Sequence, residues 1–413
     1  MDTPATILCD ITPDGATAAV GAWVRGGAAI EPAASAGITH MIEHLLLRRC
    51  GARDPRAIAE LTDALGGDVD AFTTREMCAV TAHVAFDQLV EATDLVLDAV
   101  FRPCFEAEDV DLERRVIQAE FDLVDDSPAE VAAERALEAC WGDHPLARPV
   151  LGQREIVERL HPRQLAAYHR RHFVASELLL VVVAPFDVRA DLESRCAGLP
   201  PAVASRQEVV PPSWHRGIVT DVRDSLEQVY ANLVLPGLPV GDGEQVTLGV
   251  LDQILGGGSS SRLFAEVRDR LALVYEIGTS IYSARTAGVL EVAFSAPLRN
   301  VQACWDAVLA VLEKVGREGC SDREVALARQ ALTAGVVLGT EGSDAMMEAH
   351  AGEWIARGRR FDRAAICREI AAVTPERVRD LAQRLIRLDA LAGAVCGSEA
   401  GIRLPAGLDR RTA

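Results

Sequence analysis

Two histidines, with a glutamate beside the second one, form the pattern in this chain that is best suited to chemistry. His40 and His44 stand four residues apart, and Glu43 directly precedes His44, in the segment His-Met-Ile-Glu-His. In a helix, residues four apart lie on one face with Cβ atoms about 5–6 Å apart, so both imidazoles can bind one metal ion. A carboxylate beside that ion can take a proton from an attacking water and pass it to a leaving amine. The pattern predicts metal-assisted hydrolysis, and an amphipathic helix with two incidental histidines is the alternative.

A catalytic zinc ion takes three protein ligands and keeps a fourth position open. Glu120, in a strong helical pattern over residues 107–125, is the best candidate for the third ligand. Glu113 lies two helical turns earlier on the same face, where its carboxylate can hold a ligand histidine by a hydrogen bond. By spacing alone, an ordinary solvated acidic helix face is the better interpretation of these two glutamates.

Helices and strands must position these residues, and the hydrophobic pattern predicts their order. In the first half we expect a strand over 18–24, helices over 35–49 and 54–65, strands within 69–84, helices over 86–102, 107–125 and 128–141, and a buried strand over 178–184. In the second half we expect a strand over 228–235, a helix over 243–255, strands within 276–295, helices over 299–315, 321–339, 343–357 and 375–386, and a strand over 390–395. The repeated strand–loop–helix order predicts an internal duplication of an α+β unit.

The duplication divides the chain into two homologous domains. Residues 1–190 form the expected metal-binding catalytic domain, the proline-rich residues 191–215 a linker, and residues 216–413 the second domain. The helix expected over 243–255 carries no cluster of ligand-type side chains. We therefore expect one zinc ion per chain.

Several further segments, taken with the histidine motif, resemble the pitrilysin family of metallopeptidases. They are residues 113–120 (Glu-Arg-Arg-Val-Ile-Gln-Ala-Glu), 65–76, 144–152, 260–268 and 273–275. Glu120 follows His44 by 76 residues, which is similar to the distance at which the family places its glutamate ligand. The resemblance implies that His40, His44 and Glu120 bind zinc, that Glu43 is the general base and then the general acid, and that Glu113 occupies the family's second glutamate position.

The resemblance also implies where a peptide would bind. Asp70 and Ala71 lie on the strand that pairs with substrate in the family, a form of β-augmentation. Asp70 replaces the usual asparagine and, when ionised, can only accept hydrogen bonds. Arg268 and Tyr275 match the pair that donates hydrogen bonds to the oxyanion. Ala272 replaces a common glycine just before the segment that carries Tyr275.

The family fold consists of two α/β-sandwich domains with mixed or antiparallel sheets, which together form half of a clamshell. A dimer is therefore implied, with the arginine and the tyrosine of one subunit facing the zinc of the other. A self-sufficient homodimer that hydrolyses short or unfolded peptides in a closed chamber is the favoured function. The alternatives are a subunit of a heterodimeric processing peptidase dedicated to one product, and a non-catalytic scaffold of the same fold. Manganese or cobalt could occupy the same ligands as zinc.

Composition excludes several other classes of protein. The net charge of −19, from 42 basic and 61 acidic residues, argues against a nucleic-acid partner and fits a solvated acidic surface. Ten scattered cysteines, without a Cys-x-x-Cys pair, predict reduced thiols and a cytoplasmic location. We expect no secretory leader at residues 1–6 and no membrane span. His169 and His172, in a basic stretch, are expected at the surface.

Overall fold

The computed structural model describes residues 5–200, 208–405 and 410–411. Residues 1–4, where we expected no leader, and residues 201–207 of the expected linker lie outside this part. The chain forms two compact units. The first unit contains residues 1–122, 148–209 and 339–361, and the second unit contains residues 123–147, 210–338 and 362–413.

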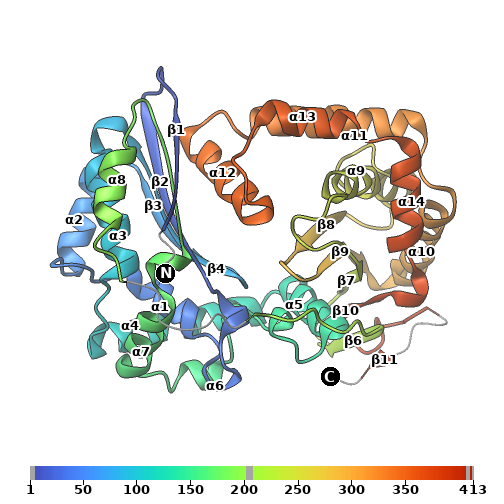
Figure 1. The fold of residues 1–413 in the computed structure, drawn as a ribbon. Helices are drawn as coiled ribbons and strands as arrows, with labels where there is room; N and C mark the ends of the chain where they lie inside the picture. Colours follow the sequence, from blue (N-terminus) through green and yellow to red (C-terminus); the bar gives the residue numbers. More distant parts are fainter. Residues whose placement is uncertain (1–4, 201–207, 406–409, 412–413) are drawn as a thin grey trace. The chain divides into compact units, whose positions relative to one another are not determined.

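The first unit is built on a five-stranded mixed sheet (Figure 1). The strand order is β1 (Thr6–Ile11), β5 (Leu178–Ala184), β2 (Thr17–Arg25), β4 (Met77–Ala85) and β3 (Asp68–Thr73). β1 pairs with β5 in parallel, and the other neighbours are antiparallel. β3 therefore lies at one edge of the sheet.

Helices cover both faces of this sheet. One face packs in the main core against α1 (Ile38–Leu46), α2 (Pro55–Leu65), α3 (Leu89–Phe101), α4 (Ala107–Asp125), α7 (Pro162–His172) and α8 (Arg189–Cys196), with the short α6 (Arg154–Val157) nearby. The other face packs against α12 (Ser343–Arg357), whose Met347 lies in a cluster with Trp23 and Val181. Alternate residues of β5 enter the two cores, which explains why its sequence is apolar without interruption.

The second unit repeats this strand order. Its sheet runs β11 (Arg410–Arg411), β6 (Gly217–Val222), β10 (Ala392–Gly397), β7 (Gln228–Pro236), β9 (Gly288–Pro297) and β8 (Ile277–Ser283). With β11 set aside, the pairing directions equal those of the first sheet, with β6 and β10 parallel and the rest antiparallel. The expected fold class, two homologous α/β domains, is confirmed.

The helices of the second unit also lie on both faces of its sheet. They are α9 (Gln245–Leu255), α10 (Val301–Glu318), α11 (Asp322–Leu338), α13 (Arg363–Ala371), α14 (Pro375–Leu385) and, on the other face, α5 (Pro128–Trp141). A π-helical turn spans Phe264–Arg270.

The two units exchange one helix each relative to the expected halves. α5 comes from the first half of the chain but packs on β7 and β10, and α12 comes from the second half but packs on β2 and β5. Each helix buries an apolar sheet face that would otherwise meet water, which hydrophobic burial favours. Helix α8, Arg189–Cys196, includes residues 191–196 of the expected linker.

Most expected helices and strands are confirmed, but the pattern missed the strands β1, β6 and β11 and the helices α6, α7, α8 and α13. The helix expected over 35–49 is shorter, because it begins at Ile38 and ends at Leu46. Among the described helices, none is both long enough and apolar enough to span a membrane.

Candidate metal centre

Helix α1 is held at its first turn by a carboxylate from the preceding loop. Glu31 is 5% exposed, and its two oxygens accept the backbone N–H groups of Gly37 and Thr39, each at 2.7 Å. These donors belong to the helix start and would otherwise have no partner within the helix. Gly37 has φ 95°, a left-handed conformation that a residue without Cβ adopts at little cost. The inner face of α1 then packs through Met41, which is fully buried.

The side chains of His40, His44 and Glu120 converge where α1 and α4 meet. One ligand atom from each of the three lies within 4.8 Å of the other two, and this is the one group of its kind in the described part of the chain. Nε2 of His40 is 3.5 Å from Oε2 of Glu120, and Nε2 of His44 is 3.3 Å from Oε1 of Glu120. Tetrahedral ligands about 2.0–2.1 Å from zinc lie about 3.3–3.4 Å apart, so the donor set fits this metal.

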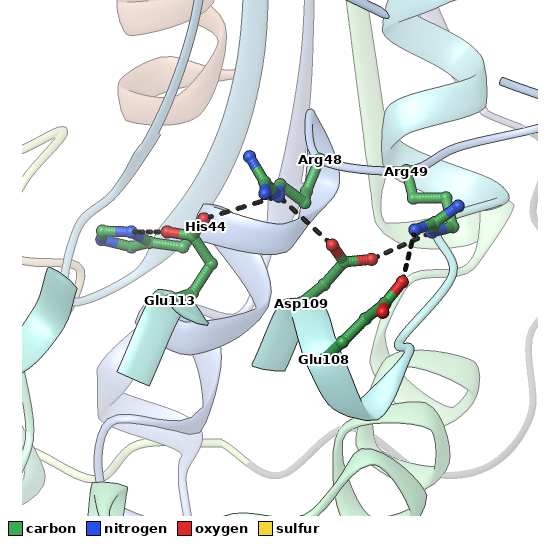
Figure 2. A network of polar contacts seen from close by, with 6 residues as sticks. All are labelled: His44, Arg48, Arg49, Glu108, Asp109 and Glu113. Atoms are coloured by element: carbon green, nitrogen blue, oxygen red, sulfur yellow. Dashed lines mark hydrogen bonds and ion pairs between the residues drawn. The ribbon is translucent and has the colours of Figure 1, made fainter. Parts of the chain in front are cut away.

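The two imidazoles are held differently. Nδ1 of His44 is 3.2 Å from Oε2 of Glu113 (Figure 2), which leaves Nε2 of His44 directed at Glu120. Burial acts to lower the pKa of His44, but the hydrogen bond with Glu113 and the charges of Glu43 and Glu120 raise it overall. Burial, with a smaller contribution from His44, lowers the pKa of His40 to about 4. His40 is therefore neutral at pH 7, the form in which an imidazole binds a metal.

Glu43 lies beside the cluster, with Oε2 3.8 Å from Nε2 of His40. Burial raises the pKa of Glu43 to about 7, and the charges of Glu120 and Asp70 act in the same direction. A carboxylate with a pKa near the working pH can both accept and return a proton. The arrangement can therefore support proton transfer next to a bound metal ion.

The predicted substrate-binding residues of the first unit lie on edge strand β3. Ala71 pairs with Val80 of β4, and β3 contacts α1. Oδ1 of the exposed Asp70 accepts the backbone N–H of Ala71 at 2.9 Å. The Asp70 carboxylate thus occupies a donor that an incoming peptide strand would need.

Arg268 and Tyr275 lie together in the second unit, while the histidine and glutamate cluster belongs to the first. The guanidinium carbon of Arg268 is 4.3 Å from the ring centroid of Phe264 and 5.5 Å from that of Tyr275. Arg268 lies in the π-helical turn, and Ala272 after it has φ 50°. This left-handed conformation favours glycine, which accounts for the family residue that Ala272 replaces.

A cavity of about 460 Å³ in the second unit is lined by Arg268, the exposed Tyr275 and Asn232. Asn232 is 5% exposed, and its buried Oδ1 accepts no hydrogen bond from the described residues. The cavity is therefore lined by one cationic donor, Arg268, while the unpaired Oδ1 of Asn232 is buried at its wall.

The prediction that His169 lies at the surface is wrong, while His172 is half-buried. His169 is 6% exposed, its Nε2 is 2.8 Å from the carbonyl oxygen of Val100, and its ring stacks on Phe173. Burial lowers the pKa of His169 to about 4. The signal was the helical spacing of Leu165, Tyr168 and His169, which places them on one buried face of α7.

Sequence reasoning also missed Glu31, Arg48 and Asn232. Glu31 comes from an irregular loop and Asn232 from a strand, so neither shares a spacing with the histidine motif. Arg48 follows the motif directly, but its role depends on α4 and is visible only in the fold.

Comparison with known proteins agrees with this fold. Residues 6–154 match the family described as Insulinase (Peptidase family M16), and residues 159–332 match the family described as Peptidase M16 inactive domain. A Mycobacterium bovis protein described as an uncharacterised zinc protease is 32% identical over 387 residues, which cover 92% of this chain and 88% of that protein.

Two more distant proteins are similar along most of the chain. A probable mitochondrial-processing peptidase subunit beta from Arabidopsis thaliana is 24% identical, over 90% of this chain and 72% of that protein. The solved structure of a protease from Helicobacter pylori superposes with a TM-score of 0.86 at 15% identity, covering 96% of this chain and 98% of that one, which shows the fold alone.

The fold is that of duplicated α/β domains, and among the described residues the candidate metal ligands His40, His44 and Glu120 all lie in the first unit. Relatives described as zinc proteases place such a chain among the metallopeptidases. The chain belongs to peptidase family M16, the insulinase family.

Proposed function

We propose that this chain is a zinc-dependent endopeptidase that hydrolyses short or unfolded peptides. The observation that carries the proposal is the convergence of His40, His44 and Glu120 with Glu43 beside them. His40, His44 and Glu120 would hold one zinc ion per chain. When bound, zinc supplies Lewis-acid activation of the attacking water and of the scissile carbonyl.

The residues of the chain have separate roles in this proposal. Glu43 takes a proton from the attacking water and returns it to the leaving amine, which its pKa of about 7 supports. Glu113 holds the His44 ring. Arg268 and Tyr275 donate hydrogen bonds to the oxygen of the scissile carbonyl as negative charge develops there.

The substrate pairs with the edge of β3 at Ala71 in this proposal. Because Asp70 already accepts the N–H of Ala71, an incoming peptide must displace that carboxylate. Displacement leaves an ionised acceptor near the cleavage site, and a basic or amide side chain of the substrate would satisfy it.

The chamber is proposed to form from two copies of this half-clamshell chain, with Arg268 and Tyr275 serving the zinc of the partner. The presence of the zinc-ligand set and the arginine–tyrosine pair on one chain supports a homodimer. The similarity to a processing peptidase subunit favours the second candidate, a heterodimer with a related chain. All ten cysteines lie in the described part of the chain as free thiols, which supports a cytoplasmic location.

The test is cleavage of a mixed peptide library by the purified protein, with products identified by mass spectrometry and the oligomeric state measured by gel filtration. A homodimer predicts cleavage by the protein alone, whereas a heterodimer predicts cleavage only after a related subunit is added. A folded protein that binds zinc but cleaves no peptide under either condition would refute both candidates and favour the non-catalytic scaffold.

A further inference from the structure

Outside the ligands, a row of charged side chains connects His44 with the first turn of α4 (Figure 2). Oε2 of Glu113 lies 3.2 Å from Nδ1 of His44, and Oε1 of Glu113 lies 3.8 Å from Nε of Arg48. Arg48 follows the last turn of α1, the helix that carries both histidines. The guanidinium group of Arg48 thus stands directly behind the carboxylate that holds a metal ligand.

The Glu113 carboxylate needs a partner for its second oxygen. Glu113 is 8% exposed, so water contributes little to its solvation, and the carboxylate of Glu120 faces the other ring nitrogen of His44, Nε2. A buried carboxylate is stable as an anion only when cations or N–H donors face it. Arg48 supplies this charge on the side away from the metal ligands.

Arg48 is itself held in place by Asp109. The carboxylate of Asp109 is 3% exposed, and it accepts Nε of Arg48 at 3.3 Å and Nε of Arg49 at 2.9 Å. Asp109 lies in the first turn of α4, where the helix dipole favours an anion. It also lies four residues before Glu113 and therefore on the same face of α4. Asp109 and Glu113, on two consecutive turns of α4, thus both contact the guanidinium group of Arg48.

We propose that Arg48 is a positioning residue of the metal centre, which acts through Glu113 to fix the His44 ring for zinc. The inference rests on the proposed function only in that the site binds zinc. Loss of a residue that orients a metal ligand typically weakens metal binding about 10–100-fold. Because Arg48 acts one residue further out, we expect the lower end of this range, about tenfold.

The test is zinc affinity, measured by competition with a chromogenic chelator, which requires no catalysis. The proteins compared are the wild type, Arg48→Met, Glu113→Gln, the double variant, and Arg49→Met as the matched control. Arg49 neighbours Arg48 and carries the same charge, but its side chain donates to Asp109 and Glu108 and not to Glu113 (Figure 2). We expect Arg48→Met to raise the Kd about tenfold and Arg49→Met to change it less than about threefold.

The double variant separates positioning from a general effect of charge. If Arg48 acts through Glu113, the Kd of the double variant equals that of Glu113→Gln within about twofold. An unchanged Kd in Arg48→Met, equal losses in Arg48→Met and Arg49→Met, or fully additive losses in the double variant would each overturn the inference. Thermal unfolding of the zinc-free proteins verifies the fold, and Arg48→Gln replaces Arg48→Met if the latter does not fold. A wild-type protein that binds no zinc would overturn the proposed function together with this inference. A wild-type protein that binds zinc, with the same Kd as the Arg48 variants, would overturn the inference alone.

Discussion

Removal of the Glu31 carboxylate tests how helix α1 is held. In the variant Glu31→Ala, the N–H groups of Gly37 and Thr39 lose acceptors at 2.7 Å in a site from which water is largely excluded. Leaving a buried donor without a partner costs about 1–3 kcal/mol, so two donors predict a loss of about 2–6 kcal/mol. The free energy of unfolding of the zinc-free protein, from urea denaturation followed by circular dichroism, measures this loss.

The pH dependence of the same variant provides an independent measurement. Burial raises the pKa of Glu31 to about 7 from 4.5, and the hydrogen bonds from Thr39 and Gly37 and the charge of Arg148 offset part of this rise. Because the folded protein binds this proton more tightly than the unfolded chain, the contribution of Glu31 to stability is largest below pH 4.5. It falls by about 3 kcal/mol as the pH rises to 7.

Glu31→Ala and Glu31→Gln should therefore be more destabilising at pH 5 than at pH 8. Asp54→Ala, which removes a carboxylate from the exposed start of α2, is the matched control and should cost about 1 kcal/mol. A Glu31→Ala variant within 0.5 kcal/mol of the wild type at both pH values would refute the reasoning.

Four other outcomes follow from the structure. His169 is buried, and its pKa is lowered to about 4 from 6.5. Its contribution to the free energy of unfolding is therefore complete above pH 6.5 and decreases by up to about 3 kcal/mol toward pH 4. In His169→Gln, the free energy of unfolding should depend less on pH between 6.5 and 4. Ala272→Gly should raise the free energy of unfolding by about 1 kcal/mol, because φ 50° suits glycine. Met347→Ala should cost about 2–5 kcal/mol in urea denaturation, because the 2% exposed side chain joins α12 to the first sheet. Tyr275→Phe should lower kcat about 100-fold with zinc affinity unchanged, and a weaker zinc affinity would contradict its proposed role at the scissile carbonyl.

The part of the fold that the sequence could predict is the part that depends on local patterns. Helix geometry alone sets the spacing of His40 and His44 and the regular recurrence of apolar residues over 107–125. Helices α1 and α4 could therefore be predicted from the sequence. β1 was missed because its six residues include a cysteine and an aspartate, which weaken the strand pattern.

Contacts between distant segments could not be predicted in this way. The exchange of α5 and α12 depends on which helix covers which sheet face. The hydrophobic periodicity of a segment predicts a helix but not the sheet on which that helix packs. Arg48 stands next to the histidine motif, yet only the position of α4 shows that it faces Glu113. The burial of His169 was missed because arginines follow it in the sequence, although its spacing from Leu165 and Tyr168 indicates a shared buried helix face.

Zinc content and peptide cleavage of the wild type beside Glu43→Gln test the central claim most directly. Both proteins should contain one zinc ion per chain, because Glu43 is not among the three residues that would hold the metal. The wild type should cleave an unfolded peptide, and Glu43→Gln should lose this activity by at least about 100-fold. A Glu43→Gln variant that keeps both its zinc and its full activity would contradict the role of Glu43, and a folded wild type without zinc would contradict the metal centre itself.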